Sequence, residues 1–461
     1  MPSFDFDSVV IGSGPAGQKA AVQGAKAGKR VALVESDREV GGHCVYRGTI
    51  PSKTLRENAV RVSTLRKHSE LFSFRLSDEV TMASLIQNMD SVIKSHDQYI
   101  KKQLSRNAIQ FFHGKATFVN PHQLDVRSPS GETRSITGEK IIIATGSYPR
   151  QAENIPIDHE HLYDSDSILS IVYLPKSLTV LGGGVIASEY ASIFLALGVE
   201  VTMIDRYPKP LGFLDQDLTD RFVSQFERCG GRFIGNAEIS EVCWNGLDAV
   251  VTTLDSGEQI ESEKLLSAAG RVANVKGLNI EAAGLTLNES GVIAVDADCR
   301  TAVSNIFAAG DIIGPPSLAS ASMEQGRRAA CSALGVDLKE MTNTLPMGIY
   351  AIPEMSSVGL TEHAARELHG DVLVGRALFE EIARGQISGI QEGMLKLVAD
   401  AKGQNLLGVH IIGEGATELI HIGQMALLHS ATIDSFVENI FNFPTLAEAY
   451  RVAALQIVGQ R

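Results

Sequence analysis

Several features of secreted, membrane-spanning and nucleic-acid-binding proteins are missing from this sequence. It has five cysteines and no C-x-x-C pair, which argues against a secreted disulfide framework and against a metal site. It has no uncharged apolar run of about 18 residues, and its first residues lack the basic and apolar regions of a signal peptide. Acidic residues outnumber basic ones by 54 to 41, and no basic stripe occurs. We therefore expect a cytoplasmic protein with no membrane span, no metal and no nucleic-acid partner.

The chain is long enough to form several domains. At roughly 100–200 residues per domain, its 461 residues correspond to about three. The apolar share of 44% and the charged share of 21% are ordinary for globular chains. Each domain can therefore bury a core of its own without disulfides or metals.

One pattern occurs twice. Residues 7–35 ("DSVVIGSGPAGQKAAVQGAKAGKRVALVE") and 177–205 ("SLTVLGGGVIASEYASIFLALGVEVTMID") each contain a short β-branched run, a glycine-rich turn, an amphipathic stretch, a second apolar run and a final acid. The interval from the first glycine of the turn to the acid is the same in both copies. This arrangement is typical of the βαβ unit that binds a dinucleotide, and two copies in register are a stronger signal than one. The sequence therefore predicts two dinucleotide sites.

Each position in the repeated pattern has its own physical role. The first glycine permits a tight turn, the second lets the backbone approach a pyrophosphate, and the third small residue lets the helix pack on the strand. The free N–H groups at the helix N-terminus attract the phosphates, and the acid accepts hydrogen bonds from ribose hydroxyls. In chain order these residues are Gly12, Gly14, Gly17 and Glu35 in the first copy, and Gly182, Gly184, Ala187 and Asp205 in the second.

Other segments predict the framework around the two copies. We expect Thr81 to Arg106 to be helical, and residues 127–135 ("RSPSGETRS") and 254–260 ("LDSGEQI") to form hairpins. Residues 140–150 ("KIIIATGSYPR") are expected to form a buried strand followed by a crossover to the next domain. From about residue 341 strands and helices alternate without a glycine fingerprint, so a third domain without a nucleotide site is expected.

Six short segments follow one another along the chain: "VVIGSGPAG", "GGHCVYRGTIPSK", "IIIATGS", "GGGVIASEYA", "AAGR" and "IFAAGDI". Their content and order resemble the motifs of the flavoprotein disulfide reductases, the family that includes dihydrolipoamide dehydrogenase and glutathione reductase. The resemblance covers nearly the whole chain. It implies that the first dinucleotide is FAD and that the second is a nicotinamide coenzyme, with NAD(H) and NADP(H) as substrates.

The resemblance also implies a fold and an assembly. The fold class is α/β, with two Rossmann-like dinucleotide-binding domains and a C-terminal α+β dimerisation domain. The expected bounds are 1–148 and 272–340 for the two parts of the FAD domain, 149–271 for the NAD(P) domain and 341–461 for the dimerisation domain. A homodimer is implied, and larger homo-oligomers are left open.

Roles for single residues follow from the same resemblance. Asp311 would hold the ribityl chain of FAD, and Thr145 and Gly146 would lie against the flavin nucleotide. Lys53 would sit near the reactive flavin nitrogen, paired with Glu189, and a cation there stabilises negative charge on the ring. Glu189 lies within an apolar helical stretch, where an unpaired carboxylate is costly, so a partner is expected. The remaining candidate contacts are Gly42, Cys44, Gly114, Lys115 and Ala319 for FAD, and Arg206, Gly270 and Arg271 for the nicotinamide nucleotide.

Two positions depart from the family pattern. The redox pair of the family is C-x-x-x-x-C, and here Cys44 is followed by Thr49 at the second position. The family's acid–base histidine precedes Pro-Thr, and here that position is Phe443; Glu448, which orients the histidine in the family, remains and is expected to be structural. Threonine forms no disulfide and phenylalanine moves no proton, so the sequence predicts that the disulfide half-reaction is absent.

Without a disulfide, the expected reaction is FAD-dependent hydride transfer between NADPH and NAD⁺ by a ping-pong route (NADPH + NAD⁺ = NADP⁺ + NADH). One alternative is an NAD(P)H diaphorase or quinone reductase, which passes electrons from the flavin to a quinone or to oxygen. Another is a non-catalytic flavoprotein that only binds nucleotide, which the intact glycine patterns, Lys53 and Glu189 disfavour. The direction of transfer follows cellular nucleotide ratios and is not encoded in these residues.

Two residues have alternative interpretations. Cys44 is either a small residue packed near the pyrophosphate or flavin, which we favour, or a redox-sensitive thiol, which requires a lowered pKa. Asp205 suits the 2′-hydroxyl of NAD and repels the 2′-phosphate of NADP. Arg206 and Lys209 follow it, and either offset that repulsion or belong to a charged surface loop.

Overall fold

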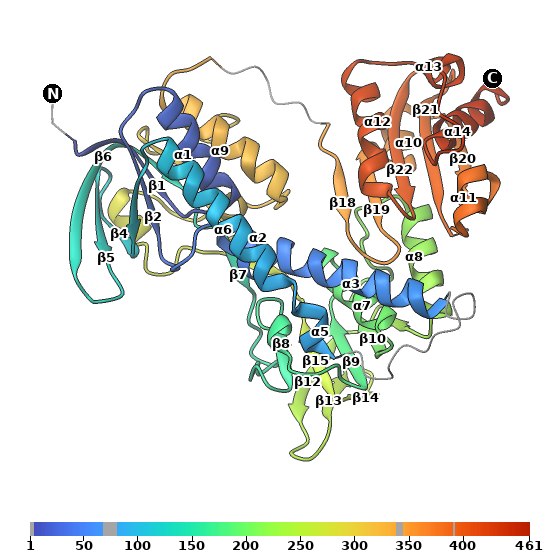
Figure 1. Ribbon diagram of the computed structural model, residues 1–461, viewed down its shortest axis with the longest axis horizontal. Helices are drawn as coiled ribbons and strands as arrows, with labels where there is room; N and C mark the ends of the chain where they lie inside the picture. Colours follow the sequence, from blue (N-terminus) through green and yellow to red (C-terminus); the bar gives the residue numbers. More distant parts are fainter. Residues whose placement is uncertain (1–3, 68–80, 338–343, 391) are drawn as a thin grey trace.

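Three units, each built on its own sheet, make up the chain. The structure is a computed structural model that describes residues 4–67, 81–337, 344–390 and 392–461. The first unit lies on the left of Figure 1, the second lies below, and the C-terminal unit lies at the upper right. The helix α3 (Thr49–Lys67) leaves the first unit and runs between the other two. A residue near the start of α3 can therefore meet side chains from all three units.

The first unit is a seven-stranded mixed sheet with helices on it. Its elements are β1 (Phe6–Ile11), α1 (Pro15–Lys26), β2 (Val31–Glu35), α2 (Gly42–Tyr46), α6 (Met89–Arg106), β3 (Gln110–His113), β4 (Lys115–Asn120), β5 (Gln123–Arg127), β6 (Thr133–Ile143), β17 (Ile306–Ala308) and α9 (Ala319–Ala333). Helix α5 (Met82–Ile86) follows α3 and packs in the core of the second unit. Strands β3, β2, β1 and β6 run parallel in that order, and β17 pairs with the end of β6. Helices α1 and α9 pack together, and the core strands are buried on both faces, as is usual for parallel sheets.

The second unit repeats the parallel arrangement. Its elements are β8 (Leu162–Asp164), β9 (Ser177–Leu181), α7 (Val185–Ala196), β10 (Glu200–Ile204), α8 (Gln216–Arg228), β11 (Arg232–Ile234), β12 (Ile239–Trp244), β13 (Val250–Leu254), β14 (Gln259–Ser262) and β15 (Lys264–Ser267). The parallel sheet has the order β11-β10-β9-β15-β8, and β12, β13 and β14 form a separate antiparallel sheet. Both βαβ units thus place a glycine turn at the carboxyl end of a central strand, where open α/β sheets bind their ligands.

The C-terminal unit has an antiparallel sheet with helices on it. Its elements are β18 (Met347–Ile349), β19 (Met355–Gly359), α10 (Glu362–His369), β20 (Val372–Leu378), α11 (Ala383–Ser388), β21 (Met394–Asp400), β22 (Leu406–Ile412), α12 (Ala416–Leu428), α13 (Ile433–Glu438) and α14 (Glu448–Val458). The strand order is β18-β19-β22-β21-β20, and all its pairs are antiparallel. Among its described residues, 344–390 and 392–461, no glycine turn of the dinucleotide type occurs.

The first and second units are joined by a two-stranded ribbon. Strand β7 (Ser147–Pro149) leads out of the first unit and β16 (Arg271–Ala273) leads back, and the two strands pair antiparallel. The predicted hairpins are also present as the β5–β6 and β13–β14 pairs. The predicted helix from Thr81 to Arg106 is two helices, α5 and α6, separated by two residues. The α/β fold class is therefore confirmed, whereas the domain bounds stay predictions.

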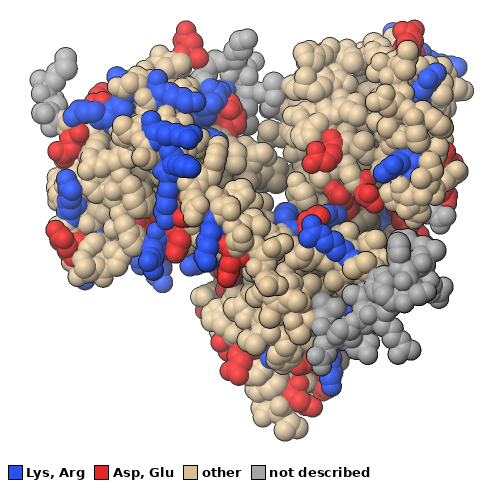
Figure 2. Space-filling view, in the orientation of Figure 1, with Lys and Arg blue, Asp and Glu red and all other residues tan. Residues whose placement is uncertain are grey.

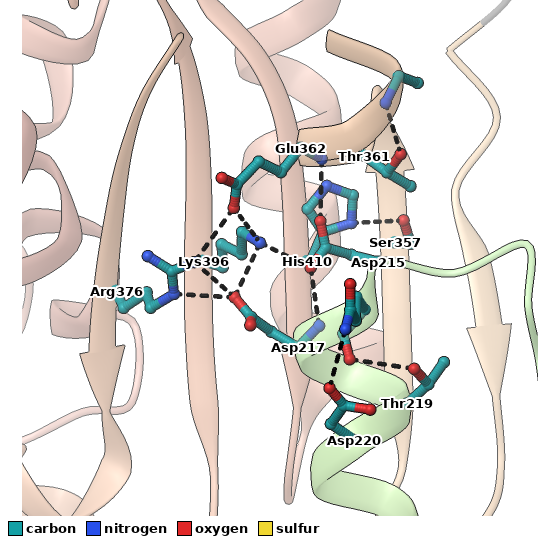
Figure 3. Close-up of polar contacts among 12 residues, drawn as sticks. Asp215, Asp217, Thr219, Asp220, Ser357, Thr361, Glu362, Arg376, Lys396 and His410 are labelled. Carbon is teal, nitrogen blue, oxygen red and sulfur yellow. Dashed lines mark hydrogen bonds and ion pairs between the residues drawn. The ribbon is translucent and has the colours of Figure 1, made fainter. Parts of the chain in front are cut away.

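The second unit meets the C-terminal unit through a buried group of charges, which we call the Lys396 cluster (Figure 3). The Lys396 side chain is 2% exposed, and its Nζ lies 2.7 Å from Asp215 Oδ1, 2.8 Å from Asp217 Oδ2 and 2.8 Å from Glu362 Oε2. Arg376 donates from Nε to Asp217 Oδ2 at 2.8 Å. Asp215 also caps the start of α8 by accepting the Asp217 N–H, so one carboxylate stabilises a helix N-terminus and joins two units.

A buried histidine borders the Lys396 cluster. His410 is fully buried; its Nε2 lies 2.9 Å from the Leu360 carbonyl and its Nδ1 lies 2.7 Å from Ser357 Oγ. Because a carbonyl only accepts, Nε2 carries the proton and Nδ1 accepts from the serine hydroxyl. Burial lowers the pKa of His410, so the imidazole is neutral.

Charge is unevenly spread on the face of the molecule shown in Figure 2. Lys and Arg side chains gather over the first unit, whereas the upper part of the C-terminal unit is mostly uncharged. Exposed apolar side chains of the C-terminal unit include Met425, Leu428, Ile440 and Leu455. Within the described ranges, no helix has both the length and the apolar character that a membrane span requires.

Candidate functional site

The first glycine turn leaves open space at its tip. A Cβ on Gly12 would lie 2.3 Å from the Ala144 carbonyl oxygen, and one on Gly17 would lie 1.8 Å from the Gly12 oxygen, so both positions exclude a side chain. A Cβ on Gly14 would meet nothing within 4 Å. Gly14 is also the N-cap of α1, whose first N–H groups face that space. The turn therefore offers a phosphate both room and free donors.

Glu35 forms hydrogen bonds within the protein that the glycine pattern did not predict. Its Oε2 accepts hydrogen bonds from the Ser13 N–H at 2.8 Å and the Ser13 hydroxyl at 2.7 Å, and its Oε1 accepts from the Asp37 N–H at 2.9 Å. The Ser13 hydroxyl in turn accepts from the Gly41 N–H at 3.0 Å. Glu35 thus fixes the glycine turn relative to α2. The sequence signal for this contact is Ser13, which stands between the two glycines of the turn.

Thr145, Gly146 and Asp311 lie near the ribbon between the first two units. The Thr145 hydroxyl is buried and has no hydrogen-bond partner among the described residues, and Gly146 has a φ of +72° with open space where a Cβ would stand. Asp311 Oδ2 accepts from the Ser147 hydroxyl at 2.7 Å. A buried hydroxyl without a partner and the open space at Gly14 and Gly146 fit a bound dinucleotide, because such a ligand would satisfy the hydroxyl and fill the space.

The other FAD candidates surround this region in different ways. Gly42 has a φ of +61°, and a Cβ on it would come within 2.9 Å of the Gly14 Cα, so α2 is packed directly on the glycine turn. Gly114 donates its N–H to the Glu35 carbonyl at 2.8 Å, and Lys115 beside it is exposed. Ala319 is the first residue of α9.

The second glycine turn has the same geometry as the first. Gly182 has a φ of +110°, and a Cβ on it would lie 2.8 Å from the Ala268 carbonyl oxygen. Gly184, the N-cap of α7, has open space around its missing side chain, and Ala187 is fully buried where the helix packs on the strand. Asp205 Oδ2 lies over Gly183, 2.1 Å from where a Cβ would stand, and burial raises the pKa of this carboxyl.

The two cations after Asp205 are engaged with neighbours. The Arg206 guanidinium stacks on the Tyr207 ring at 4.9 Å and donates to the Tyr207 hydroxyl at 3.0 Å. Lys209 forms an ion pair with Asp220. Arg206 and Tyr207 are exposed, so a ligand can displace their contact, whereas Lys209 is held by a carboxylate.

Arg271 is bonded within the protein at the base of the ribbon. It donates to the Ser147 hydroxyl at 2.9 Å, the Ser147 carbonyl at 2.8 Å, the Ser165 hydroxyl at 3.1 Å and Asp166 Oδ1 at 3.0 Å. Asp166 Oδ2 also contacts His43 Nε2 at 2.5 Å. Arg271 therefore ties the two units together. Gly270 beside it has a φ of +103° and little around its Cβ position.

Lys53 and Glu189 form the ion pair that was expected. Lys53 Nζ lies 2.7 Å from Glu189 Oε2, and the Glu189 carboxylate is 4% exposed, so its charge is compensated as burial requires. Glu189 Oε1 accepts the Tyr350 N–H at 2.9 Å, and the Tyr350 ring centroid lies 5.0 Å from Lys53 Nζ. Tyr350 was absent from the sequence predictions because it comes from the third unit, far from both partners along the chain.

Cys44 lies beside Thr49, without a second sulfur. Burial raises the pKa of the Cys44 thiol, and this outweighs the lowering by the Thr49 hydrogen bond and by the Lys53 charge. The thiol is therefore held protonated at neutral pH, which disfavours the redox-sensitive interpretation. None of the five cysteines forms a disulfide.

The C-terminal segment carries the other departure from the family pattern. The Phe443 side chain is 75% exposed, and Glu448 Oε2 accepts the Thr445 N–H at 3.3 Å, at the start of α14. Glu448 thus bonds within the turn that leads into its own helix, and the structural role expected for it stays a prediction.

Comparisons with known proteins agree with this architecture. Residues 6–326 match the family described as pyridine nucleotide-disulphide oxidoreductase, and residues 345–454 match the dimerisation domain of the same family. The chain therefore belongs to the pyridine nucleotide-disulphide oxidoreductases. It is an oxidoreductase with FAD as cofactor and pyridine nucleotides as substrates.

Individual proteins of the family resemble this chain over nearly its full length. A protein of Mycobacterium bovis named soluble pyridine nucleotide transhydrogenase is 42% identical over 99% of this chain and 98% of its own length. One of the same name from Colwellia psychrerythraea is 40% identical over 98% of each chain. Among solved structures, LpdA of Mycobacterium tuberculosis has a TM-score of 0.90 at 25% identity, covering 98% of this chain and 99% of its own. The HOCl-induced flavoprotein disulfide reductase RclA of Escherichia coli has a TM-score of 0.88 at 30% identity, covering 97% and 99%.

Proposed function

We propose that this protein transfers hydride between NADPH and NAD⁺ through FAD, by a ping-pong route and without a redox-active disulfide. The observation that carries the proposal is Cys44 beside Thr49: the thiol is protonated, and the only side chain at the partner position is a hydroxyl. A disulfide half-reaction needs two sulfurs and a thiolate. The relatives named transhydrogenase span the whole chain and support the same reaction.

The residues of the chain would divide the work as follows. When bound, FAD would supply a ring that takes up a hydride and gives it back. Lys53 supplies a positive charge at that ring, and Glu189 keeps the ammonium in place. Gly14 and the N-terminus of α1 would bind the FAD pyrophosphate, and Thr145 would supply its free hydroxyl. The two nicotinamide nucleotides would reach that ring one after the other.

The second unit would bind both nicotinamide nucleotides. We propose that residues 149–271 form this domain, with Gly184 at the pyrophosphate and Asp205 at the ribose next to adenine. Arg206 would leave the Tyr207 ring to meet the 2′-phosphate of NADP, because a guanidinium binds phosphate better than a phenol does. Arg206→Ala should therefore raise the KM for NADPH about tenfold and leave that for NADH within about twofold. An equal effect on the two would contradict this assignment.

The C-terminal unit would form a homodimer. It matches a dimerisation domain, and its exposed apolar side chains include Met425, Leu428 and Ile440. Large apolar side chains that are exposed close together on one unit are typical of interfaces between copies. Sedimentation of the purified protein would test this, and a monomer at micromolar concentration would contradict it.

An anaerobic assay tests the reaction itself. NADPH is supplied with an NAD⁺ analogue whose reduced form absorbs at a separate wavelength, with quinone and oxygen absent. We expect steady formation of the reduced analogue, with initial rates that give parallel lines in double-reciprocal plots. Flavin reduction that stalls until a quinone is added would instead support the diaphorase.

A further inference from the structure

Tyr350 is the residue through which the C-terminal unit reaches Lys53. It follows directly on β18, and its half-buried ring faces the ammonium at 5.0 Å from the centroid. The face of an aromatic ring carries partial negative charge, and a cation within about 6 Å is attracted to it. Lys53 therefore has two electrostatic partners, one carboxylate from the second unit and one ring from the third.

The backbone of Tyr350 acts on the same ion pair. Its N–H donates to Glu189 Oε1, while the other carboxylate oxygen of Glu189 receives Lys53. The two carboxylate oxygens of Glu189 thus bond to different partners, and these two contacts fix the orientation of the carboxylate plane. One residue of the C-terminal unit consequently touches both members of the pair.

The Tyr350 phenol is half-buried and uncharged. Burial raises its pKa, so the hydroxyl keeps its proton at neutral pH. The contact with Lys53 therefore involves the face of a neutral ring.

A neighbouring contact joins the same segments without touching Lys53. The Ile352 N–H donates to the Ser192 hydroxyl at 3.0 Å, one turn along α7 from Glu189. It supports the docking of the C-terminal unit on α7 but adds no charge or ring at the ammonium. Ser192 thus provides a matched control for Tyr350.

We propose that Tyr350 is a positioning residue for hydride transfer, which holds the Lys53 ammonium at one place through its ring and its backbone N–H. The C-terminal unit then has a task in the reaction besides joining copies of the chain. The inference rests on the proposed function for the task of Lys53, but the contact itself does not depend on which acceptor takes the hydride.

The first experiment measures the chemical reactivity of the Lys53 amine and does not depend on enzyme activity. The purified enzyme is treated with an amine-acetylating reagent, and the rate at Lys53 is followed by peptide mass spectrometry. In Tyr350→Leu, Lys53 should react about 3- to 30-fold faster, because the ring contact is lost. Tyr350→Phe keeps the ring, and Ser192→Ala keeps both contacts, so both should match the wild type. An unchanged rate in Tyr350→Leu, or an equal increase in Ser192→Ala, would overturn the proposal.

The second experiment measures the bound flavin. The midpoint potential of Tyr350→Leu should move to more negative values, since a loosely held cation stabilises the reduced ring less well. Reduction of the flavin by NADPH in a single turnover should slow by about 3- to 30-fold, and Tyr350→Phe should restore both values. If Tyr350→Leu does not fold, Tyr350→Met removes the ring with a flexible side chain of similar length. No change in either variant would overturn the proposal.

The two proposals can fail separately. If NADPH reduces the wild-type flavin but no NAD⁺ analogue is reduced, the proposed function fails, while a slower single turnover in Tyr350→Leu still supports the positioning role. If the wild type transfers hydride between nucleotides and Tyr350→Leu does so at the same rate and potential, the positioning role fails alone.

Discussion

The second unit is joined to its neighbours through two lysines, and they differ in how their charge is matched. Lys396 is 2% exposed and has three carboxylates within 2.8 Å, from Asp215, Asp217 and Glu362. Lys53 is 25% exposed and has one carboxylate at 2.7 Å and the face of a ring. An ammonium group surrounded by three carboxylates has its charge fully compensated, so it attracts a ligand only weakly. A partly exposed ammonium group with a single carboxylate can still stabilise negative charge on a bound ligand. The difference separates a structural junction from the one to which we assign a role in the proposed reaction.

At the Lys396 cluster, burial and ion pairing act on the pKa values in opposite directions. Burial lowers the pKa of Lys396, but the three carboxylates outweigh it and leave the pKa raised. The same interaction holds the pKa values of Asp217 and Glu362 below their usual range. The cluster is therefore fully ionised at neutral pH. Breaking it from one side leaves charges buried without partners, which is the costly case for ion pairs.

Removing the central lysine should have the largest effect. Lys396→Met leaves three carboxylates facing one another at the junction, and we expect the free energy of unfolding to fall by about 3–5 kcal/mol. The midpoint of urea unfolding, followed by circular dichroism, measures this. Lys102→Met, at an exposed position on α6, serves as control and should change stability by less than about 0.5 kcal/mol. Equal effects of the two substitutions would show that Lys396 contributes no more to stability than an exposed lysine does.

Removing the other lysine should affect catalysis more than stability. In Lys53→Met, FAD should remain bound, and flavin reduction by NADPH in stopped flow should slow by about 10²-fold, the usual cost of losing one preorganised electrostatic contact. The unfolding midpoint should fall less than in Lys396→Met, because Lys53 is partly solvated and its partner keeps the Tyr350 N–H. Reduction at the wild-type rate would show that Lys53 is only structural.

Acid should weaken the Lys396 junction in two stages. His410 has a lowered pKa, so its contribution is complete above about pH 6.5, the ordinary value, and declines as the pH falls below it, because the unfolded chain takes up the proton first. The lowered pKa values of Asp217 and Glu362 add a second loss below about pH 4. Urea midpoints from pH 8 to pH 3 measure both stages. The second stage should shrink in Lys396→Met, and its persistence there would assign it to other carboxylates.

The smallest effect on hydride transfer is expected from substitution of Cys44, which lies near Lys53. Cys44 contacts Thr49 and is protonated, so Cys44→Ser should bind FAD normally and keep hydride transfer within about twofold of the wild type. Loss of turnover with FAD still bound would mean that the thiol takes part in the reaction. Steady-state rates with NADPH and an NAD⁺ analogue measure this.

The sequence predicted the parts of the site that depend on local pattern. Both glycine turns have the expected open tip, because the positive φ at Gly12 and Gly182 requires glycine, and the local pattern supplies it. The pairing of Lys53 with Glu189 was also predicted, since a carboxylate in an apolar helix needs a partner and the family pattern supplied one. The binding roles of these residues stay predictions.

Contacts between distant segments could not be predicted in the same way. Lys396 stands in an apolar strand sequence, "MLKLVAD", where nothing indicates three carboxylates from two other elements. Tyr350 reaches Lys53 across about three hundred residues, and only the packing of all three units decides that contact. Arg271 has four bonds within the protein that its motif did not predict, and its contact with the nucleotide stays a prediction.

The ribbon of β7 and β16 has a consequence for how this chain can be taken apart. Pro149 lies opposite Arg271 and Ser147 lies opposite Ala273, so the chain enters and leaves the second unit at neighbouring points. The second unit is thus an insertion whose two ends are already side by side. A short loop can close the first unit after its removal, and the excised piece can be exchanged for one with a different coenzyme preference through a single pair of splice sites.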